Sequence, residues 1–295
     1  MTDDKTKLKS GKTYHDDLSI VRSEIDKCMK CGNCMAVCPV YGVEKEEASV
    51  TRAKIKVVDA VLNGQLELDD PEVYNMIFNC LVCKSCMTNC PSKVDFGKIA
   101  LAMRAALVRK KGLFWLKKMI FSTLKNPAVL NTGIKTAAAM QSIVFKADKD
   151  IKAISPRSPF ALVGSGFGFD SNRKMPELNS KTLKDITPEV VKPDEVKVKV
   201  AFFVGDSLNY FYPDAGLDVI EVLKKNNVEV HIPKAQNCCG IPVLVHGDIE
   251  TARTLARRNI DTFEKTGCDY IITACGSCGG AWQHEYVDLL KEDPL

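Results

Sequence analysis

The sequence predicts an α+β protein, in which a mostly helical N-terminal part precedes a small parallel α/β domain. A cysteine spacing repeats within the first 100 residues, apolar residues at helical spacing continue to about residue 149, and strand-like and helix-like segments alternate from residue 197. Such alternation is typical of a parallel sheet covered by helices. The chain has 295 residues, 45% of them hydrophobic, which is enough for two domains of unequal size.

Changes in composition predict the domain boundaries. Residues 1–18 are charged and lack periodicity, which indicates a flexible tail. Residues 151–196 contain five prolines, and their GSGFGF stretch at 164–169 lacks the flanking strand and helix of a dinucleotide-binding loop. The predicted segments are a tail over 1–18, a domain with the internal repeat over 19–110, a helical extension over 111–150, a linker over 151–196 and an α/β domain over 197–295.

The thirteen cysteines indicate a reducing compartment. The N-terminus has no apolar signal-peptide core, and no apolar stretch reaches the ~18 residues of a membrane span. Cysteines in such a chain are better explained by metal ligation or redox chemistry than by disulfides. The sequence therefore predicts a cytoplasmic protein.

Two cysteine runs carry the strongest chemical signal. Each has the pattern C-x2-C-x2-C-x3-C-P, and the spacing of the first run recurs 52 positions later. A helix is predicted over 51–64, between the two runs. This pattern is typical of 4Fe-4S clusters, and in two-cluster ferredoxins the fourth cysteine of each run binds the other cluster. The predicted ligands are Cys28, Cys31, Cys34 and Cys90 for cluster 1, and Cys80, Cys83, Cys86 and Cys38 for cluster 2.

The alternative for these runs is a pair of zinc sites in an interaction module. Zinc sites usually take two ligands from each of two separated C-x2-C knuckles, whereas each run here has four cysteines within eleven residues. The pattern thus favours iron–sulfur clusters. Two clusters with their thiolates add about −4 to the formal charge of +4, so the charge gives no reason to expect nucleic acid as a partner.

A second group of cysteines lies in the α/β domain. NCCGIP follows the second predicted strand, ACGSCGG follows the third, and Asp206 follows the first. Loops after parallel strands open on the same edge of a sheet, so these residues should surround one site. The candidate ligands of a third cluster are Cys238, Cys239, Cys275 and Cys278, with Asp206 as a further candidate. Cys268 is isolated and is expected to be a packing residue.

The stretch from FFVGDSLNY through NCCGIP to ACGSC resembles the CCG domain of the heterodisulfide reductase family. With the cysteine runs before it, the chain is similar to the fused iron–sulfur subunits of that family, including those of glycolate or D-lactate dehydrogenases and anaerobic glycerol-3-phosphate dehydrogenase. The resemblance implies an α-helical ferredoxin domain followed by a CCG domain. Family members usually have a cysteine at the position of Asp206 and a second CCG domain. The sequence stops soon after its first C-x2-C pair, so it is expected to lack the second CCG domain, either as a fragment or because another polypeptide supplies that half.

The resemblance implies an electron-transfer subunit of an oxidoreductase. Its expected partners are a flavoprotein dehydrogenase, acting on a 2-hydroxy acid or glycerol 3-phosphate, and a membrane or quinone-linked subunit, in a hetero-oligomer. The alternative within the family is an enzyme that reduces a disulfide at the CCG domain. The segment LFWLKKMIFSTLK also suits a helix on a membrane surface or against a partner subunit.

Overall fold

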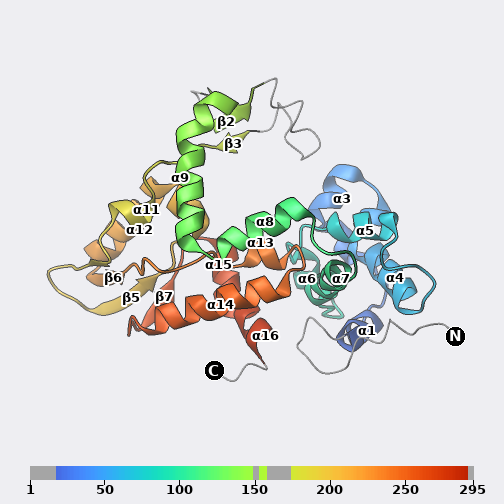
Figure 1. Cartoon of the computed structure of the whole chain (residues 1–295). Coiled ribbons are helices and arrows are strands. Elements are labelled where there is room, and N and C mark those ends of the chain that lie inside the picture. Colours follow the sequence, from blue (N-terminus) through green and yellow to red (C-terminus); the bar gives the residue numbers. More distant parts are fainter. Residues whose placement is uncertain (1–17, 149–152, 158–173, 292–295) are drawn as a thin grey trace. The chain divides into compact units, whose positions relative to one another are not determined.

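The computed structural model describes residues 18–148, 153–157 and 174–291 (Figure 1). The tail predicted over 1–18, apart from residue 18, and the GSGFGF stretch lie outside these residues. The chain divides into two compact units. The first comprises residues 1–119, 240–253 and 283–295, and the second comprises residues 120–239 and 254–282. The boundaries predicted at residues 110, 150 and 196 stay predictions.

The first unit is helical. Its elements are α1 (Leu18–Asp26), α2 (Asn33–Ala36), α3 (Pro39–Glu44), the 3₁₀ turn η1 (Glu47–Ser49), α4 (Thr51–Leu62), α5 (Pro71–Phe78), α6 (Ser85–Thr88), α7 (Phe96–Lys111), α13 (Ile241–Leu244) and α16 (Tyr286–Leu290). Helices α1, α4, α5 and α6 pack against α7. Eleven residues of α7 between Phe96 and Leu107 are buried, so α7 is the central helix of this unit.

Local sequence signals fix the ends of these helices. The Asp70 carboxylate accepts hydrogen bonds from two backbone amides of the first turn of α5, and the Asp95 carboxylate accepts one from Lys98 at the start of α7. Three basic residues end α7, where they complement the helix dipole. The helix predicted over 51–64 is confirmed as α4, and Gly64 follows it with φ +71°.

The second unit contains two sheets. Its elements are α9 (Pro127–Val144), β1 (Phe145–Asp148), β2 (Ala153–Pro156), β3 (Met175–Pro176), α11 (Leu183–Ile186), β4 (Val190–Val191), β5 (Val198–Phe202), the π-helical turn η3 (Ser207–Phe211), α12 (Pro213–Lys225), β6 (Val228–His231), β7 (Tyr270–Ile272) and α15 (Gly276–Gly280). Three elements contribute residues to both units: α8 (Trp115–Leu124), α14 (Ile249–Glu264) and the π-helical turn η4 (Ala281–Glu285).

The larger sheet has the strand order β4-β6-β5-β7. Strand β5 pairs in parallel with β6 and β7, so the three predicted strands and the predicted α+β class are confirmed. Strand β4 adds an antiparallel edge to β6. This edge strand lies within the predicted linker, where two valines between prolines are too short a segment to show a period.

The smaller sheet is antiparallel, with the order β1-β2-β3. Helix α9 ends at Val144, and Phe145 has an extended backbone that begins β1. The predicted helical extension over 111–150 is therefore helical only as far as Val144. The apolar residues before β1 continue a helical period, and pairing with β2, the next strand along the chain, decides where the helix stops.

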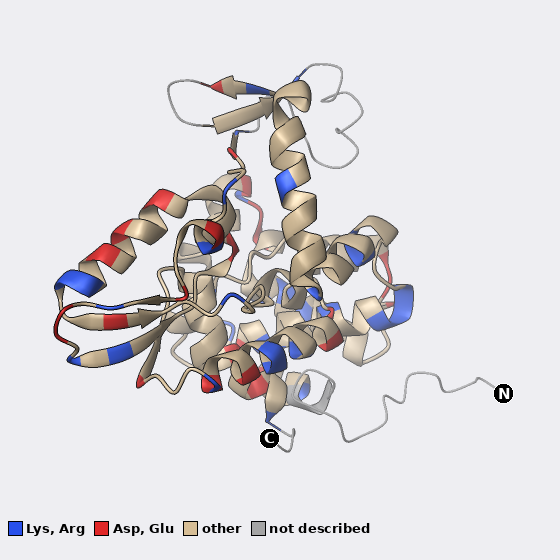
Figure 2. Ribbon diagram, turned by 60° about the vertical axis from the view of Figure 1, so that its left-hand side comes forward, with Lys and Arg blue, Asp and Glu red and all other residues tan. Residues whose placement is uncertain are grey.

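The core of the second unit lies between the larger sheet and α12. Its buried residues are Leu183, Val200, Phe202, Val204, Leu208, Ile220, Val228, Val230 and Ile232. Acidic and basic residues alternate with others along the α12 ribbon (Figure 2), with Asp214 in the first turn and two lysines in the last. A Cβ atom at Gly216 would lie 2.2 Å from Leu183 Cδ2, so this glycine permits close packing of α12 on α11.

Candidate cluster-binding sites

The two cysteine runs have the same backbone geometry. A four-residue helix, α2 or α6, begins at corresponding positions of each run. Both loops turn through the left-handed region at the same two places, which are Lys30 (φ +62°) and Gly32 (φ +86°) in the first and Val82 (φ +51°) and Lys84 (φ +63°) in the second. The sequence repeat is thus also a repeat of three-dimensional structure.

Val82 is the most strained of these loop residues. A β-branched residue with positive φ is a true outlier, because its side chain crowds the backbone. Such strain persists where the surroundings fix the conformation, and it concentrates at functional sites. The residues around the loop from Cys80 to Cys83 therefore stabilise a backbone conformation that is unfavourable for Val82 itself.

Each run contributes to two hollows of similar size, about 420 Å³ for the first and about 450 Å³ for the second. The cysteines lining the first hollow are Cys28, Cys31, Cys34, Cys86 and Cys90. Those lining the second hollow are Cys38, Cys80, Cys83 and Cys86. Each hollow thus combines cysteines of one run with the last cysteine of the other, as the predicted exchange of the fourth ligand requires, while Cys86 borders both.

The residues present fit an iron–sulfur cluster. Burial raises the pKa of the Cys34 and Cys86 thiols above the ordinary value, since a thiolate in an apolar wall is unfavourable. An iron–sulfur core supplies the positive charge that allows such thiols to bind as thiolates. The buried Arg104, whose Nε atom lacks a hydrogen-bond partner, carries the complementary charge beside Cys80.

The third group of cysteines lies at the carboxyl edge of the larger sheet. Asp206 follows β5, Cys238 and Cys239 follow β6, and Cys275 and Cys278 follow β7. Hydrogen-bonding contacts join these five side chains in the order Asp206, Cys238, Cys239, Cys278, Cys275. The structure therefore brings together all five residues that the sequence assigned to one site.

Two glycines allow these loops to approach one another. Gly205 has φ +67°, and a Cβ atom there would lie only 2.9 Å from Cys278 Sγ. Gly240, the glycine of the CCG motif, has φ +83° and turns the chain directly after Cys239. Because other residues rarely adopt such φ values, both positions favour glycine.

The third site carries perturbed acids. The hydrogen bond with Cys239, burial and the nearby Asp206 all raise the pKa of the Cys238 thiol. The hydrogen bond with Cys239 and burial likewise raise the pKa of Cys278, and burial raises that of the Asp206 carboxyl. The raised pKa values keep the two thiols and the carboxyl protonated. A bound cation would displace these protons, because it stabilises the thiolate and carboxylate forms.

A hollow of about 320 Å³ lies beside Asp206 and Cys238. Lys184 and Tyr210 are among its other lining residues. Burial and the charge of Asp206 raise the pKa of Tyr210 to about 12. The tyrosine hydroxyl therefore stays protonated at neutral pH and can donate a hydrogen bond.

Cys268 forms hydrogen bonds with Thr266, two residues before it, and its thiol lies 3.9 Å from the Thr266 carbonyl oxygen. Among the residues that the structure describes, no group of three or more His, Cys, Asp or Glu side chains has a geometry suited to a single metal ion.

Sequence reasoning missed Lys54 and Arg104 as site residues. Lys54 lines the second hollow, and Arg104 donates a hydrogen bond to the Cys80 carbonyl oxygen. A signal for Lys54 was present, because it falls with Thr51, Ile55 and Val58 on the buried stripe of α4. A lysine on an apolar stripe needs a buried partner or an anion.

Two family models match the chain. A 4Fe-4S dicluster domain matches residues 24–94, and a cysteine-rich domain, CCG, matches residues 200–282. These matches cover both cysteine runs and all five residues of the third site. No solved structure gives a significant match.

Several curated proteins are similar to the chain. A probable glycolate oxidase iron-sulfur subunit of Bacillus subtilis is 28% identical over 92% of this chain and 61% of its own length. An uncharacterized iron-sulfur protein of Methanococcus maripaludis is 23% identical over 93% of this chain and 47% of its own length. Lactate utilization protein A of Halalkalibacterium halodurans is 35% identical over 33% of this chain and 39% of its own length.

The chain spans about three fifths of the length of the Bacillus subtilis relative and about half of that of the Methanococcus maripaludis relative. Its two matched domains follow one another in the order that the cysteine patterns predicted, and the resemblance to iron–sulfur subunits is confirmed. The chain joins a 4Fe-4S dicluster domain to a CCG domain, and it is similar to a probable glycolate oxidase iron-sulfur subunit.

Proposed function

We propose that the chain is an electron-transfer subunit that passes single electrons from a flavoprotein dehydrogenase, through two 4Fe-4S clusters, to the CCG domain and on to a quinone or another carrier. The observation that carries this proposal is the pair of similar hollows, each lined by cysteines from both runs. Ligands shared between the runs tie the two clusters together within one helical unit. Such sharing favours a relay between them.

The names of the relatives support the class of electron donor. One is a probable glycolate oxidase iron-sulfur subunit, and another is a lactate utilization protein. Both names point to a 2-hydroxy acid as the substrate of the flavoprotein partner, and the family resemblance adds glycerol 3-phosphate as a second candidate. The chain would then act within a hetero-oligomer.

The proposed ligands are Cys28, Cys31, Cys34 and Cys90 for the first hollow, and Cys80, Cys83, Cys86 and Cys38 for the second. A third cluster is proposed at Cys238, Cys239, Cys275 and Cys278, with Asp206 as a candidate oxygen ligand. The run of contacts through these five side chains supports this third site.

Iron and sulfide analysis of the anaerobically purified protein tests the proposal. Two clusters give about eight iron and eight sulfide per chain, and a third raises each number to about twelve. Changing Cys238 and Cys239 together to serine is expected to lower the iron content from about twelve to about eight, without altering the EPR signals of the dicluster domain.

Two outcomes of this measurement would contradict the proposal. A colourless protein that contains zinc and no acid-labile sulfide would show a zinc-stabilised module instead. Unchanged iron content and EPR spectra in the double serine variant would remove the third cluster from the proposal.

Disulfide reduction at the CCG domain is the second candidate function. The contacts that join Cys238, Cys239 and Cys278 favour it, because adjacent thiols can exchange with a disulfide. Reducing one disulfide to two thiols consumes two electrons and two protons. Turnover of a heterodisulfide by the purified protein with reduced viologen as electron donor, and without a flavoprotein, would favour this function over the relay.

We also propose that α8 contacts an anionic membrane surface. Trp115 and Met119, one turn apart, have 63% and 52% of their surface exposed, and Lys117 and Lys118 lie between them. Within the described ranges, no helix is long and apolar enough to cross a bilayer.

Sedimentation with lipid vesicles tests this contact. The protein is expected to sediment with vesicles containing phosphatidylglycerol, and the Trp115→Ser, Met119→Ser variant is expected to stay in the supernatant. Met140→Ser is the control, because Met140 on α9 is also 52% exposed. Failure of the unaltered protein to sediment would contradict the membrane contact.

A further inference from the structure

Lys54 is a buried cation in the wall of the second hollow. Only 1% of its surface is exposed, and its Nζ atom donates a hydrogen bond to the Ser49 carbonyl oxygen. Cys38 and Cys80 line the same hollow. Burial lowers the pKa of Lys54, and negative charge on these two thiolates and on the Glu44 carboxylate acts in the opposite direction.

Arg104 is a second buried cation, reaching the same cysteine loop from α7. It is 4% exposed, and its guanidinium group donates hydrogen bonds to the carbonyl oxygens of Ile77 (2.9 Å), Cys80 (2.5 Å) and Val245 (2.6 Å). The group also lies over the Phe78 ring, 4.9 Å from its centroid. The carbonyl oxygens accept the hydrogen bonds of the guanidinium group and the ring packs against it, but none of them carries a negative charge that neutralises it.

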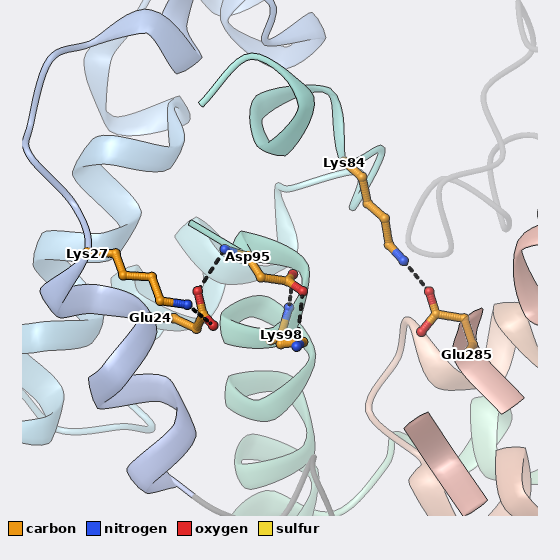
Figure 3. Close-up of polar contacts among 6 residues, drawn as sticks. All are labelled: Glu24, Lys27, Lys84, Asp95, Lys98 and Glu285. Atoms are coloured by element: carbon orange, nitrogen blue, oxygen red, sulfur yellow. Dashed lines mark hydrogen bonds and ion pairs between the residues drawn. The ribbon is translucent and has the colours of Figure 1, made fainter. Parts of the chain in front are cut away.

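In the described part of the chain, neither cation forms an ion pair with a carboxylate. The carboxylate whose charge acts on Lys54 is that of Glu44, which accepts hydrogen bonds from the Ser49 hydroxyl and the Asn79 amide. Three other carboxylates of this unit have lysine partners, as Figure 3 shows: Glu24 pairs with Lys27 (2.7 Å), Asp95 with Lys98 (3.5 Å), and Glu285 with Lys84. A buried cation without a directly paired anion is unfavourable. An anionic cluster in the second hollow would provide that counter-ion.

The first hollow has a different electrostatic environment. Its nearest guanidinium group, that of Arg52, is 30% exposed and forms an ion pair with Glu47. Solvent access to the cysteines is alike in the two runs, since the second cysteine of each, Cys31 or Cys83, is exposed and the others are partly buried. The two sites therefore differ in buried positive charge far more than in exposure.

From this difference we infer that the cluster bound by Cys80, Cys83, Cys86 and Cys38 has the higher reduction potential of the two. The inference rests on the proposed function, because it requires both clusters. Reduction adds one negative charge to a cluster that, with its thiolates, already carries about −2. Buried cations stabilise that added charge more strongly than a solvent-screened ion pair does.

The direction of electron flow between the clusters follows from this order. One electron leaves the reduced cluster of the first hollow, which returns to its oxidised state, and enters the oxidised cluster of the second hollow. No bond is formed or broken, and no proton needs to move. The second cluster is therefore the one from which electrons leave the dicluster domain.

A redox titration of the unaltered holoprotein, followed by EPR, tests this order. Cys31→Ser and Cys83→Ser, each of which changes one cluster, assign the two signals. The signal altered by Cys83→Ser is expected to titrate at the higher potential. The expected difference is at least about 59 mV, which corresponds to a tenfold preference of the electron for that cluster. Equal potentials or the reverse order would overturn the inference.

The Lys54→Met variant tests the cause, because methionine keeps the length of the side chain without its charge. The variant is expected to lower the potential of the Cys83-assigned signal and to leave the other signal unchanged. Arg52→Met is the matched control and should lower only the other signal, by a smaller amount. A shift of both signals, or of neither, in Lys54→Met would contradict the electrostatic explanation.

Iron analysis of the same samples separates the inference from the proposed function. Fewer than about eight iron atoms in the unaltered protein would contradict the two-cluster proposal itself. Two loaded clusters with the opposite order of potentials would contradict only the inference. If Lys54→Met loses iron, the order in the unaltered protein still decides the question.

Discussion

Replacing Cys90 by alanine is expected to remove the cluster of the first cysteine run, although Cys90 is the last cysteine of the second run. The reason is that Cys90 lines the same hollow as Cys28, Cys31 and Cys34. The measurement is the iron content, which should fall by about four per chain, together with loss of one EPR signal on reduction. Cys38→Ala should remove the other cluster in the same way, since Cys38 lines the second hollow.

Double variants distinguish this exchange from binding within each run. If Cys28 and Cys90 bind one cluster, changing both to alanine should cost no more iron than changing either one. Changing Cys80 and Cys90 together should instead remove about eight iron atoms. The opposite pattern would show that each run binds its own cluster.

Cys268→Ala is the control for this series. Its thiol forms a hydrogen bond with the Thr266 carbonyl oxygen and belongs to neither cysteine run, so the iron content and EPR spectra should not change. Loss of iron in this variant would show that cysteine substitutions act through general unfolding, and the exchange would then have to be tested with serine variants of the same positions.

The sequence predicted the parts of the structure that depend on local pattern. The two runs share one backbone geometry because the spacing of the cysteines and the turns between them repeat. The third site could be located from three separate loops because parallel strands end on one edge of a sheet. In both cases the order of residues along the chain is enough to predict which residues lie close together.

Features that depend on distant packing could not be predicted in this way. Strand β4 exists because β6 offers an edge, and two valines alone carry no signal for it. Arg104 lies among the buried apolar residues of α7, and its role depends on carbonyl groups 24 to 27 and 141 residues away in the chain. Residues 240–253 also pack in the first unit, although they follow the CCG motif in sequence.

That packing leads to a prediction about Gly247, which has φ +86°. A Cβ atom at this position would lie 2.5 Å from the Arg104 carbonyl oxygen, a backbone atom of α7 that cannot move alone. Gly247→Ala should therefore destabilise the protein through left-handed strain of about 1–2 kcal/mol and overpacking of about 1–3 kcal/mol. The midpoint of thermal unfolding of the cluster-loaded protein should fall by about 4 °C or more.

Gly64→Ala separates the two causes within the same unit. Gly64 also has positive φ, at +71°, but a Cβ atom there would have no neighbour within 4 Å. Its substitution therefore carries the strain without the overpacking, and its unfolding midpoint should fall by less than that of Gly247→Ala. Equal losses would mean that close packing of Gly247 on α7 contributes nothing to stability. A larger loss for Gly247 would show that the segment after the CCG motif is held against α7 by contact with the backbone that carries Arg104.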